Sequence, residues 1–299
     1  MRHAETEAEL TAAPGYAALR TRLKTILDSK DRIPYVSLYE GRYYNFWRDA
    51  EHERGIWRRT TLESYRTAQP AWETVLDVDA LGKQEGKSWV FAGANCLAPS
   101  YTRCLISLSP GGGDSTVVRE FDTVKKAFID GGFQIPEAKQ EVVWQDENTL
   151  IVGSDFGPGS LTDSGYPRVL KRWKRGTPLA SAETVFEGEK TDVAASAGVD
   201  RKTGRVFFSR ALDFYRSAMW MEQGGQRTKI DKPEDAGLST WRDAQGREWA
   251  LLTLKSDQKW GKARHVSGSL LAIPFADYLA GKREFTVLFK PTASRTLAD

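Results

Sequence analysis

The side chains that could perform hydrolytic chemistry are few and scattered along this sequence. His52 lies in a charged turn, and His265 has no carboxylate beside it in the sequence. A serine nucleophile of the hydrolase type needs the pattern G-x-S-x-G on a sharp turn between a strand and a helix. The stretch Gly113-Asp-Ser115-Thr-Val117 has only the first half of that pattern. We therefore predict no catalytic residue in this chain and interpret Ser115 as a turn serine.

The cysteines and histidines are also too few and too widely spaced for a metal centre. Cys96 and Cys104, with His3, His52 and His265, lack the spacing of a zinc site, so we predict no metal and no cofactor. The two cysteines flank what looks like a hairpin tip, across which a disulfide can form. In a chain without a secretory signal, two free buried thiols are the favoured interpretation, and a disulfide is the alternative.

A long glycine-rich loop between Asp155 and Arg168 is the best local candidate for function. It lies between two apolar strands of one predicted unit. Long ordered loops on rigid scaffolds often contact ligands or other domains. Asp155, Asp163 and Arg168 are the candidate contacts for a peptide or for another domain. The alternative is a structural loop in which Asp and Ser cap their own turns.

Other charged positions have simpler explanations. In Lys171-Arg-Trp-Lys-Arg175 the alternation of a strand places Trp173 on the face opposite Arg172 and Lys174, so we expect a solvated strand with one buried Trp and no nucleic-acid site. The net charge of +3 likewise indicates no strong attraction to nucleic acid. Some propellers are glycosidases that use paired carboxylates, but acids that recur at equivalent repeat positions indicate equivalent turns. These acids are Asp146, Asp155, Asp243 and Asp257.

The elements that must position these residues are repeated. Glu141-Val-Val-Trp-Gln-Asp146 with the strand after it is echoed by Gly237-Leu-Ser-Thr-Trp-Arg-Asp243 with its own next strand, about two periods of 40–50 residues later. From Ile33 onward apolar residues alternate with period two between Gly-rich and Asp-rich turns, which predicts strands. We interpret residues 33–290 as five successive units of up to four strands each. Their repeat of 40–50 residues is that of β-propeller blades. Four similar phrases each read as the outer strand of a unit: Glu73–Asp77, Thr116–Asp122, Glu183–Glu187 and Phe285–Phe289.

One amphipathic helix is predicted before the strands, at residues 15–30. Its apolar stripe must be buried against something, because a lone amphipathic helix is not stable by itself. The stripe consists of Tyr16, Leu19, Leu23, Ile26 and Leu27. We thus expect an N-terminal helical segment at 1–31 and an all-β propeller domain at 32–299.

Several long strings resemble the prolyl oligopeptidase family of serine peptidases. They are Asp31-Arg-Ile-Pro34, Tyr43-Tyr-Asn-Phe-Trp-Arg-Asp-Ala-Glu-His52, Gly55-Ile-Trp-Arg-Arg-Thr-Thr61, Trp72-Glu-Thr-Val-Leu-Asp77, Phe156–Arg168 and Lys171–Leu179. The resemblance runs from Tyr16 to the C-terminus. It implies a seven-bladed propeller paired with a C-terminal α/β-hydrolase domain, near which the N-terminal helix packs. Five predicted units imply an incomplete propeller without its catalytic domain.

The function expected from this resemblance is that of a substrate gate. The propeller of a serine peptidase covers the active site, so that short peptides reach the serine while folded proteins do not. This chain alone is then expected to be inactive, and its partner is a peptide substrate that the hydrolase domain binds. The alternative is a self-contained propeller that is a binding module or a glycosidase. The polar first residues have no signal-peptide core, so we predict a cytoplasmic protein. A lost signal peptide would instead place the protein in the periplasm. No segment is apolar enough to cross a bilayer, so we predict no membrane partner.

Overall fold

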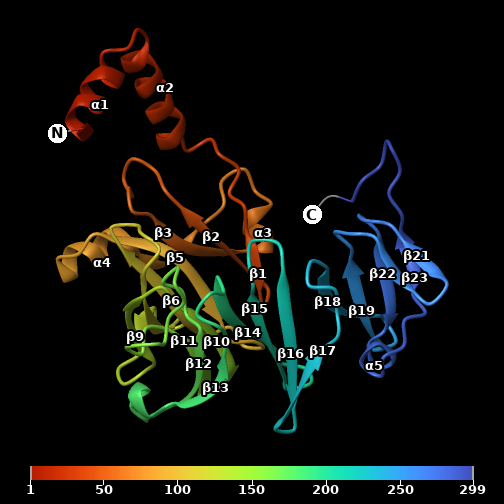
Figure 1. The fold of residues 1–299 in the computed structure, drawn as a ribbon. Helices are drawn as coiled ribbons and strands as arrows, with labels where there is room; N and C mark the ends of the chain where they lie inside the picture. The colour runs from red at the N-terminus through yellow and green to blue at the C-terminus, as the bar shows by residue number, and fades with distance from the viewer. Residues whose placement is uncertain (1, 298–299) are drawn as a thin grey trace. The chain divides into compact units, whose positions relative to one another are not determined.

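Antiparallel sheets dominate the fold, which a computed structural model describes for residues 2–297 (Figure 1). Within residues 2–297, five sheets of four or five strands follow one another, with a sixth sheet of two strands inserted in the last of them, and nearly all strands that pair are also neighbours in sequence. This up-and-down order is that of propeller blades, and it confirms the predicted all-β fold with five blades. The chain divides into two compact units, residues 1–138 and residues 139–299, which are described separately.

Unit one, residues 1–138, holds the N-terminal helices and blades one and two. The helices are α1 (Arg2–Thr11) and α2 (Tyr16–Asp28). Blade one consists of β1 (Ser37–Tyr39), β2 (Arg42–Trp47), β3 (Ile56–Thr61) and β4 (Glu73–Asp77). Blade two consists of β5 (Trp89–Cys96), β6 (Arg103–Pro110), β7 (Thr116–Asp122), β8 (Ala127–Phe128) and β9 (Gln134–Ala138). Two short helices, α3 (Leu62–Tyr65) and α4 (Val78–Glu85), lie on either side of β4.

Aromatic side chains join blades one and two inside unit one. The ring of Phe91 in β5 stacks on Phe46 of β2 with centroids 4.6 Å apart, and it lies 6.1 Å from the ring of Trp57 in β3. Trp57 is buried and also contacts Phe121 of β7. Because aromatic residues favour strands and bury large apolar areas, the same side chains select the strand conformation and hold the two sheets together.

Unit two, residues 139–299, holds blades three, four and five. Blade three consists of β10 (Glu141–Asp146), β11 (Thr149–Gly153), β12 (Val169–Lys174) and β13 (Glu183–Glu187), with a short 3₁₀ turn at Leu179–Ser181. Blade four consists of β14 (Ala194–Asp200), β15 (Arg205–Ala211), β16 (Ser217–Gln223) and β17 (Gln226–Ile230). Blade five consists of β18 (Gly237–Arg242), β19 (Glu248–Thr253), β22 (Leu270–Pro274) and β23 (Thr286–Phe289). A separate hairpin, β20 (Gln258–Trp260) and β21 (Ala263–His265), and the helix α5 (Phe275–Leu279) belong to the connections of blade five.

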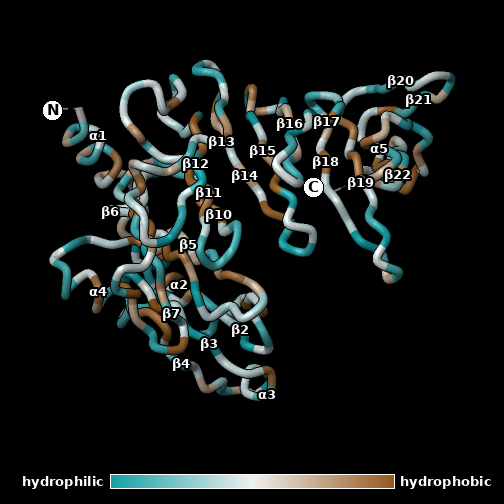
Figure 2. Tube along the Cα trace, turned by 90° about the horizontal axis from the view of Figure 1, so that it is seen from below, coloured by the Kyte–Doolittle hydropathy of each residue, from teal (hydrophilic) through white to brown (hydrophobic). Residues whose placement is uncertain are grey.

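The core of unit two lies between neighbouring blades. Phe186 of blade three stacks on Phe208 of blade four with centroids 4.9 Å apart. A second cluster joins Met221 of blade four to Leu252 and Leu271 of blade five. Hydrophobic residues fall mainly on the strands, and hydrophilic residues fall mainly on the turns (Figure 2). Within unit two, blade four is thus buried against blades three and five, which protects its apolar faces from water.

The N-terminal segment differs from the prediction in two ways. It forms two helices instead of one, since α1 precedes the predicted helix and Gly15, with φ of +86°, separates the two. Residues 2–11 lack an apolar stripe, so periodicity missed α1, although their Ala and Glu residues favour helix. The stripe on α2 is not buried in unit one, where Leu23 is 49% exposed and Leu27 is 65% exposed.

Two details of the blades also correct the prediction. Thr116–Asp122, predicted as an outer strand, is the third strand of blade two, because β8 and β9 pair with its outer edge. Blade four gains a fourth strand, β17, that the prediction lacked. Four of the five residues of β17 are exposed, so this strand has no apolar alternation by which sequence reasoning could find it.

Cys96 and Cys104 form a disulfide, so the favoured interpretation as free thiols is wrong. The two cysteines are opposite each other in the register of β5 and β6. Their proximity depends on how the hairpin pairs, which the spacing of the cysteines alone does not determine.

Gly55 is required by its surroundings, and its substitution tests the packing of blade one. Its φ is +98°, and a β-carbon there would lie 2.6 Å from Cζ of Phe46 and 2.8 Å from Cγ of Arg48. We expect Gly55→Ala to lower the free energy of unfolding by about 1–2 kcal/mol, measured by urea denaturation. Gly113→Ala is the matched control, because Gly113 has open space around it and no positive φ. Equal stability of the two variants would contradict this prediction.

Candidate substrate-contact loop

The loop predicted as a candidate contact joins β11 to β12 and is wound around a buried serine. The hydroxyl of Ser160, which is 5% exposed, donates to the carbonyl oxygen of Gly157 at 2.7 Å and accepts from the backbone N–H of Phe156 at 2.9 Å. The carbonyl oxygen of Ser160 accepts from the backbone N–H of Arg168 at 3.0 Å. These bonds close the loop on itself, so its conformation is fixed by its own polar groups.

The three predicted contact residues lie at separate points of this loop. Asp155 accepts from the backbone N–H of Gly157 at 2.9 Å, and Asp163 pairs with Lys190 at 3.3 Å. Arg168 donates from Nε to the carbonyl oxygen of Gly159 at 2.7 Å and from Nη1 to that of Gly188 at 2.8 Å. Asp155 therefore caps its own turn, and Arg168 also helps to hold the loop, whereas the exposed ion pair of Asp163 contributes little. Their contact with a peptide or with another domain stays a prediction.

The loop is also attached to blade four within unit two. The backbone N–H of Asp163 donates to the carbonyl oxygen of Lys190 at 2.8 Å, and the hydroxyl of Thr162 donates to that of Val193 at 3.1 Å. The N–H of Ala195 donates to the carbonyl oxygen of Pro167 at 2.8 Å. A loop fixed at several points loses little conformational entropy on contact with a partner, which favours binding.

Arg168 is the residue whose removal should loosen this loop most. We expect Arg168→Ala to speed amide hydrogen exchange in residues 156–168 about tenfold, because it loses one hydrogen bond to a loop carbonyl group, that of Gly159, and one that ties the loop to Gly188 after β13. Lys190→Ala is the control, since it removes only an exposed ion pair whose side chains are 76% and 58% exposed. Unchanged exchange in Arg168→Ala would show that the backbone alone holds the loop.

Sequence reasoning missed two exposed aromatic residues at the turn between β15 and β16. Phe214 and Tyr215 are 90% and 86% exposed. The turn is held by Asp213, which accepts from the backbone N–H groups of Tyr215 and Arg216 at 2.8 Å each. The sequence signal was the Asp that opens this turn between two apolar strands, which is typical of a tight turn.

The aromatic turn and the long loop leave their blades at the same end. Both connect the second strand of a blade to the third. Both also adjoin Val193, whose carbonyl oxygen accepts from Thr162 while its N–H donates to the carbonyl oxygen of Ala211, the last residue of β15. Unit two thus presents a rigid loop and an aromatic pair on one edge, which together could contact a peptide.

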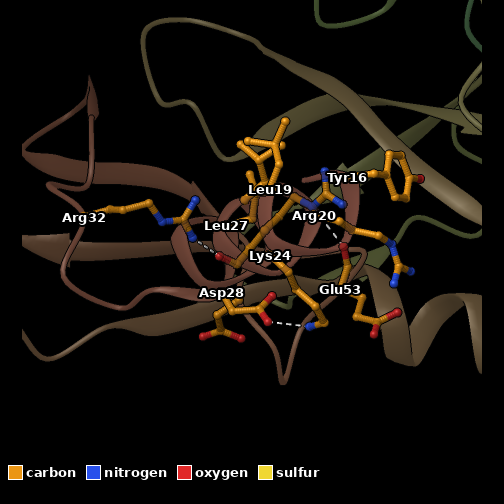
Figure 3. Close-up of a pocket in the computed structure, with 11 residues that line it drawn as sticks. Tyr16, Leu19, Arg20, Lys24, Leu27, Asp28, Arg32 and Glu53 are labelled. Atoms are coloured by element: carbon orange, nitrogen blue, oxygen red, sulfur yellow. Dashed lines mark hydrogen bonds and ion pairs between the residues drawn. The ribbon is translucent and has the colours of Figure 1, made fainter. Parts of the chain in front are cut away.

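A separate hollow of about 580 Å³ lies in unit one beside α2 (Figure 3). Residues Tyr16, Leu19, Leu23 and Leu27 of the apolar stripe line it on the helix side, and Arg48, Asp49 and Glu53 line it on the side of the β2–β3 turn. Arg32 joins the two sides, because its guanidinium lies 4.7 Å from the ring centroid of Trp47 and also donates to the carbonyl oxygen of Arg48. The hollow therefore combines an apolar wall with charged groups.

The β2–β3 turn beside this hollow is organised by a buried carboxylate. Burial raises the pKa of Asp49, but hydrogen bonds from Trp47 Nε1, from the His52 ring and from two backbone N–H groups outweigh it, so the pKa falls to about 2. His52 Nδ1 lies 3.0 Å from Asp49 Oδ1. His52 is thus a turn residue, as the sequence suggested, and its partner is a carboxylate that shapes the turn.

The remaining chemical candidates are structural in the described part of the chain. Asp146 accepts from the N–H of Asn148 in the β10–β11 turn, and Asp243 accepts from the N–H of Gln245 in the β18–β19 turn. The recurring acids at these two positions therefore cap equivalent turns. Trp173 is 7% exposed, which fits the expected buried Trp of its strand. No group of His, Cys, Asp and Glu that could hold a metal occurs among residues 2–297.

Comparison with known proteins agrees with this fold. The family model described as the prolyl oligopeptidase N-terminal beta-propeller domain matches residues 4–258. An uncharacterized peptidase of Sinorhizobium fredii is 40% identical over 97% of this chain, and one of Rickettsia prowazekii is 30% identical over 96% of it. The solved structure of a post-proline cleaving enzyme from Rickettsia typhi is 31% identical over 97% of this chain, with a TM-score of 0.88.

The chain spans less than half of each of these proteins. It covers 41% of the Sinorhizobium peptidase, 42% of the Rickettsia prowazekii peptidase and 44% of the solved enzyme. Oligopeptidase B from Leishmania major has the same fold, with a TM-score of 0.60 at 11% identity. The similarity therefore extends over the propeller portion of these peptidases.

Proposed function

Because this chain belongs to the prolyl oligopeptidase family, of which it supplies the N-terminal β-propeller, we propose that it is the non-catalytic, substrate-gating part of a serine oligopeptidase. The observation that carries this proposal is the match of the propeller family model to residues 4–258. The whole enzyme would hydrolyse short peptides by acyl transfer, with Ser, His and Asp supplied by a hydrolase domain. The chain alone would hydrolyse nothing.

Rigid blades suit the gating role. Packed sheets with fixed loops cannot widen easily, so a propeller over an active site admits a flexible peptide and excludes a folded protein. The edge of unit two that carries Phe214 and the loop at 155–168 would face the passing peptide. In this proposal Asp155, Asp163 and Arg168 are the residues of that loop that contact the peptide or the hydrolase domain, and Asp155 and Arg168 also hold the loop in place.

The exposed stripe of α2 fits the same proposal. An N-terminal segment at 1–31 would carry that stripe to the hydrolase domain, and the propeller domain would begin at residue 32. Leu19, Leu23 and Leu27 would then be buried in the whole enzyme, although they are exposed in unit one. Burial of such a stripe is the usual source of stability for an amphipathic helix.

The proposal is tested by assays of the chain and of a longer polypeptide that adds a hydrolase domain. We expect no cleavage of a short proline-containing fluorogenic peptide by the purified chain. We expect the longer polypeptide to cleave that peptide but not the same sequence within a folded carrier protein. Cleavage by the chain alone, or equal cleavage of peptide and carrier, would contradict the proposal.

Phe214 and Tyr215 provide a sharper test of peptide contact. In the longer polypeptide we expect Phe214→Ala with Tyr215→Ala to lower kcat/KM for the short peptide about tenfold, because rigid exposed aromatic residues often anchor a ligand. The melting temperature should not change, because both side chains are exposed. An unchanged kcat/KM would remove these two residues from the peptide path and leave the gating proposal standing.

The compartment is also a proposal. No helix among residues 2–297 has the length and apolar character to cross a membrane. The cytoplasm, expected from the sequence, remains our proposal, and the Cys96–Cys104 disulfide makes the periplasm its specific alternative. Cell fractionation with an antibody against this chain distinguishes the two.

A further inference from the structure

Blades one and two of unit one enclose a small aromatic pocket that the gating proposal does not use. Its volume is about 190 Å³, and its lining comes from the start of blade one, from β3 and from β5 of blade two. Sites for drug-sized ligands begin at roughly 300 Å³. This pocket is therefore too small for such a ligand and fits a single side chain with its backbone.

The strand register places the lining side chains of blade one on one face of the sheet. Ser37 is opposite Tyr44, and Phe46 is opposite Trp57. Because side chains alternate along a strand, Tyr39 shares the face of Ser37, and Phe46 shares the face of Tyr44. All five residues line the pocket. They therefore form one continuous surface.

Aromatic rings form most of this surface. The ring centroid of Tyr44 lies 5.0 Å from that of Trp57 and 5.4 Å from that of Tyr39. Phe91 of β5 closes the pocket from blade two, because its ring stacks on Phe46 with centroids 4.6 Å apart. Aromatic faces of this kind pack well against a flat apolar ring.

Tyr35 extends the pocket into solvent. It lines the pocket and is 87% exposed, and Asn45 Nδ2 donates to its carbonyl oxygen at 2.8 Å, which holds the backbone there in place. Among the described residues no Asp, Glu, Lys or Arg lines the pocket. A charged group would lose its hydration there without gaining a partner, so the pocket favours an uncharged ligand.

A hydrogen-bond donor in the wall has no partner. Within residues 2–297 the indole N–H of Trp57 makes no hydrogen bond, although the residue is only 4% exposed. Its Nε1 is not one of the unpartnered atoms that are sealed from solvent, so an acceptor from outside the chain can reach it. Buried donors are almost always hydrogen-bonded in folded proteins. The wall therefore offers a donor to a ligand with a carbonyl group.

We propose that this pocket binds a proline-containing peptide segment in the polyproline II conformation. The prolyl ring is uncharged and packs on the aromatic rings, as in other aromatic-lined grooves that bind such segments. A polyproline II backbone has no internal hydrogen bonds, so a carbonyl oxygen beside the ring is free to accept from Trp57 Nε1. The pocket is separate from the loop edge of unit two, and the chain alone binds the segment whether or not the gating proposal is correct.

The test uses the full 299-residue chain with acetylated and amidated hexaproline as the probe. A six-residue Gly-Ser peptide with the same end groups is the comparison. NMR of the chain with ¹⁵N-labelled tryptophan reports the indole N–H of Trp57, whose resonance is assigned with Trp57→Phe. We expect saturable binding of hexaproline, about tenfold tighter than that of the flexible peptide, with a shift of the Trp57 resonance.

Absence of saturable hexaproline binding, or a Trp57 resonance that does not move, would overturn the proposal. Equal affinity for the two peptides would overturn the proline component of the ligand. Neither result affects the gating proposal, which the cleavage assays test separately.

Two exposed side chains separate the pocket from the opposite face of the sheet. Tyr35→Ala should weaken hexaproline binding about fivefold, because a ring of the pocket is lost. Leu38→Ala is the matched control, since Leu38 is 59% exposed and lies between Ser37 and Tyr39, which places its side chain on the other face of β1. Melting temperatures verify that both variants fold. Equal affinity of the two variants for hexaproline would overturn the proposal.

Discussion

Replacement of Phe208 by alanine is expected to lower the free energy of unfolding by about 3–5 kcal/mol, the range found for large aromatic deletions in cores. Phe208 is 0% exposed and lies between blades three and four of unit two. Its ring stacks on Phe186 of β13, and the guanidinium of Arg227 lies 4.7 Å from its centroid. The substitution removes contacts of both blades at once and leaves a cavity that β-sheets cannot readily close.

Urea denaturation followed by circular dichroism measures this effect. Phe214→Ala is the matched control, because it deletes the same side chain six positions later at a site that is 90% exposed. We expect that control to change the free energy of unfolding by less than about 0.5 kcal/mol. A loss below about 1 kcal/mol in Phe208→Ala would show that packing between blades three and four contributes little to stability.

The second large effect is expected from an ion-pair network between blades four and five. Arg242 of β18 pairs with Asp200 of blade four and with Glu248 of β19 at 3.0 Å, and Glu248 also pairs with Arg205 of β15. The side chains are 15–23% exposed. Arg242→Gln leaves Asp200 without its cationic partner, so we expect a loss of about 2–3 kcal/mol at neutral pH.

This network also makes stability depend on pH. Burial raises the pKa of Asp200, but hydrogen bonds from Arg242, Thr203 and the backbone N–H of Lys202 outweigh it and lower the pKa to about 2. An unfolded Asp has a pKa of about 3.9. The folded carboxyl thus binds a proton less readily, and its stabilising contribution is complete above about pH 5 and is lost as the pH falls toward 2.

Denaturation of wild type and Arg242→Gln at pH 7 and at pH 2.5 tests the network. The difference in free energy of unfolding between the two proteins should shrink at the lower pH by about 1–2 kcal/mol, because at pH 2.5 Asp200 is protonated in the unfolded state of both proteins, whereas the ion pair keeps it largely ionised in folded wild type. Lys190→Gln, which breaks an exposed pair, is the control and should have little effect at either pH. A difference that is the same at both pH values would exclude Asp200 as its source.

The candidate site illustrates how far sequence reasoning reaches. The loop at 155–168 was identified by its length and glycines, and the structure places it between strands of blade three as expected. The hydrogen bonds that the side chains of this loop make to backbone carbonyl groups could not be predicted from the sequence. Arg168 bonds to the carbonyl oxygens of Gly159 and Gly188, and the latter lies 20 positions away in sequence. The exposure of Phe214 and Tyr215 was not predicted, because two adjacent aromatic residues can be either buried or exposed and the sequence alone does not distinguish these cases.

The sequence by itself determined the blades. Alternating apolar residues in stretches such as Glu141–Asp146 and Gly237–Arg242, separated by Gly and Asp turns, specify strands through local geometry, and the repeat period specifies that they form similar sheets. The family resemblance followed from the same local strings. These features need only neighbouring residues, so they can be read without coordinates.

Only the tertiary structure decided which distant residues meet. The Cys96–Cys104 disulfide depends on hairpin register, the Arg242–Asp200 pair depends on how blades four and five pack, and the aromatic pocket at Trp57 depends on how blades one and two pack. The polar helix α1 and the exposed strand β17 form without the apolar pattern that identifies other elements. Such contacts arise from long-range packing energies, and these have no fixed signature in the order of residues along the chain.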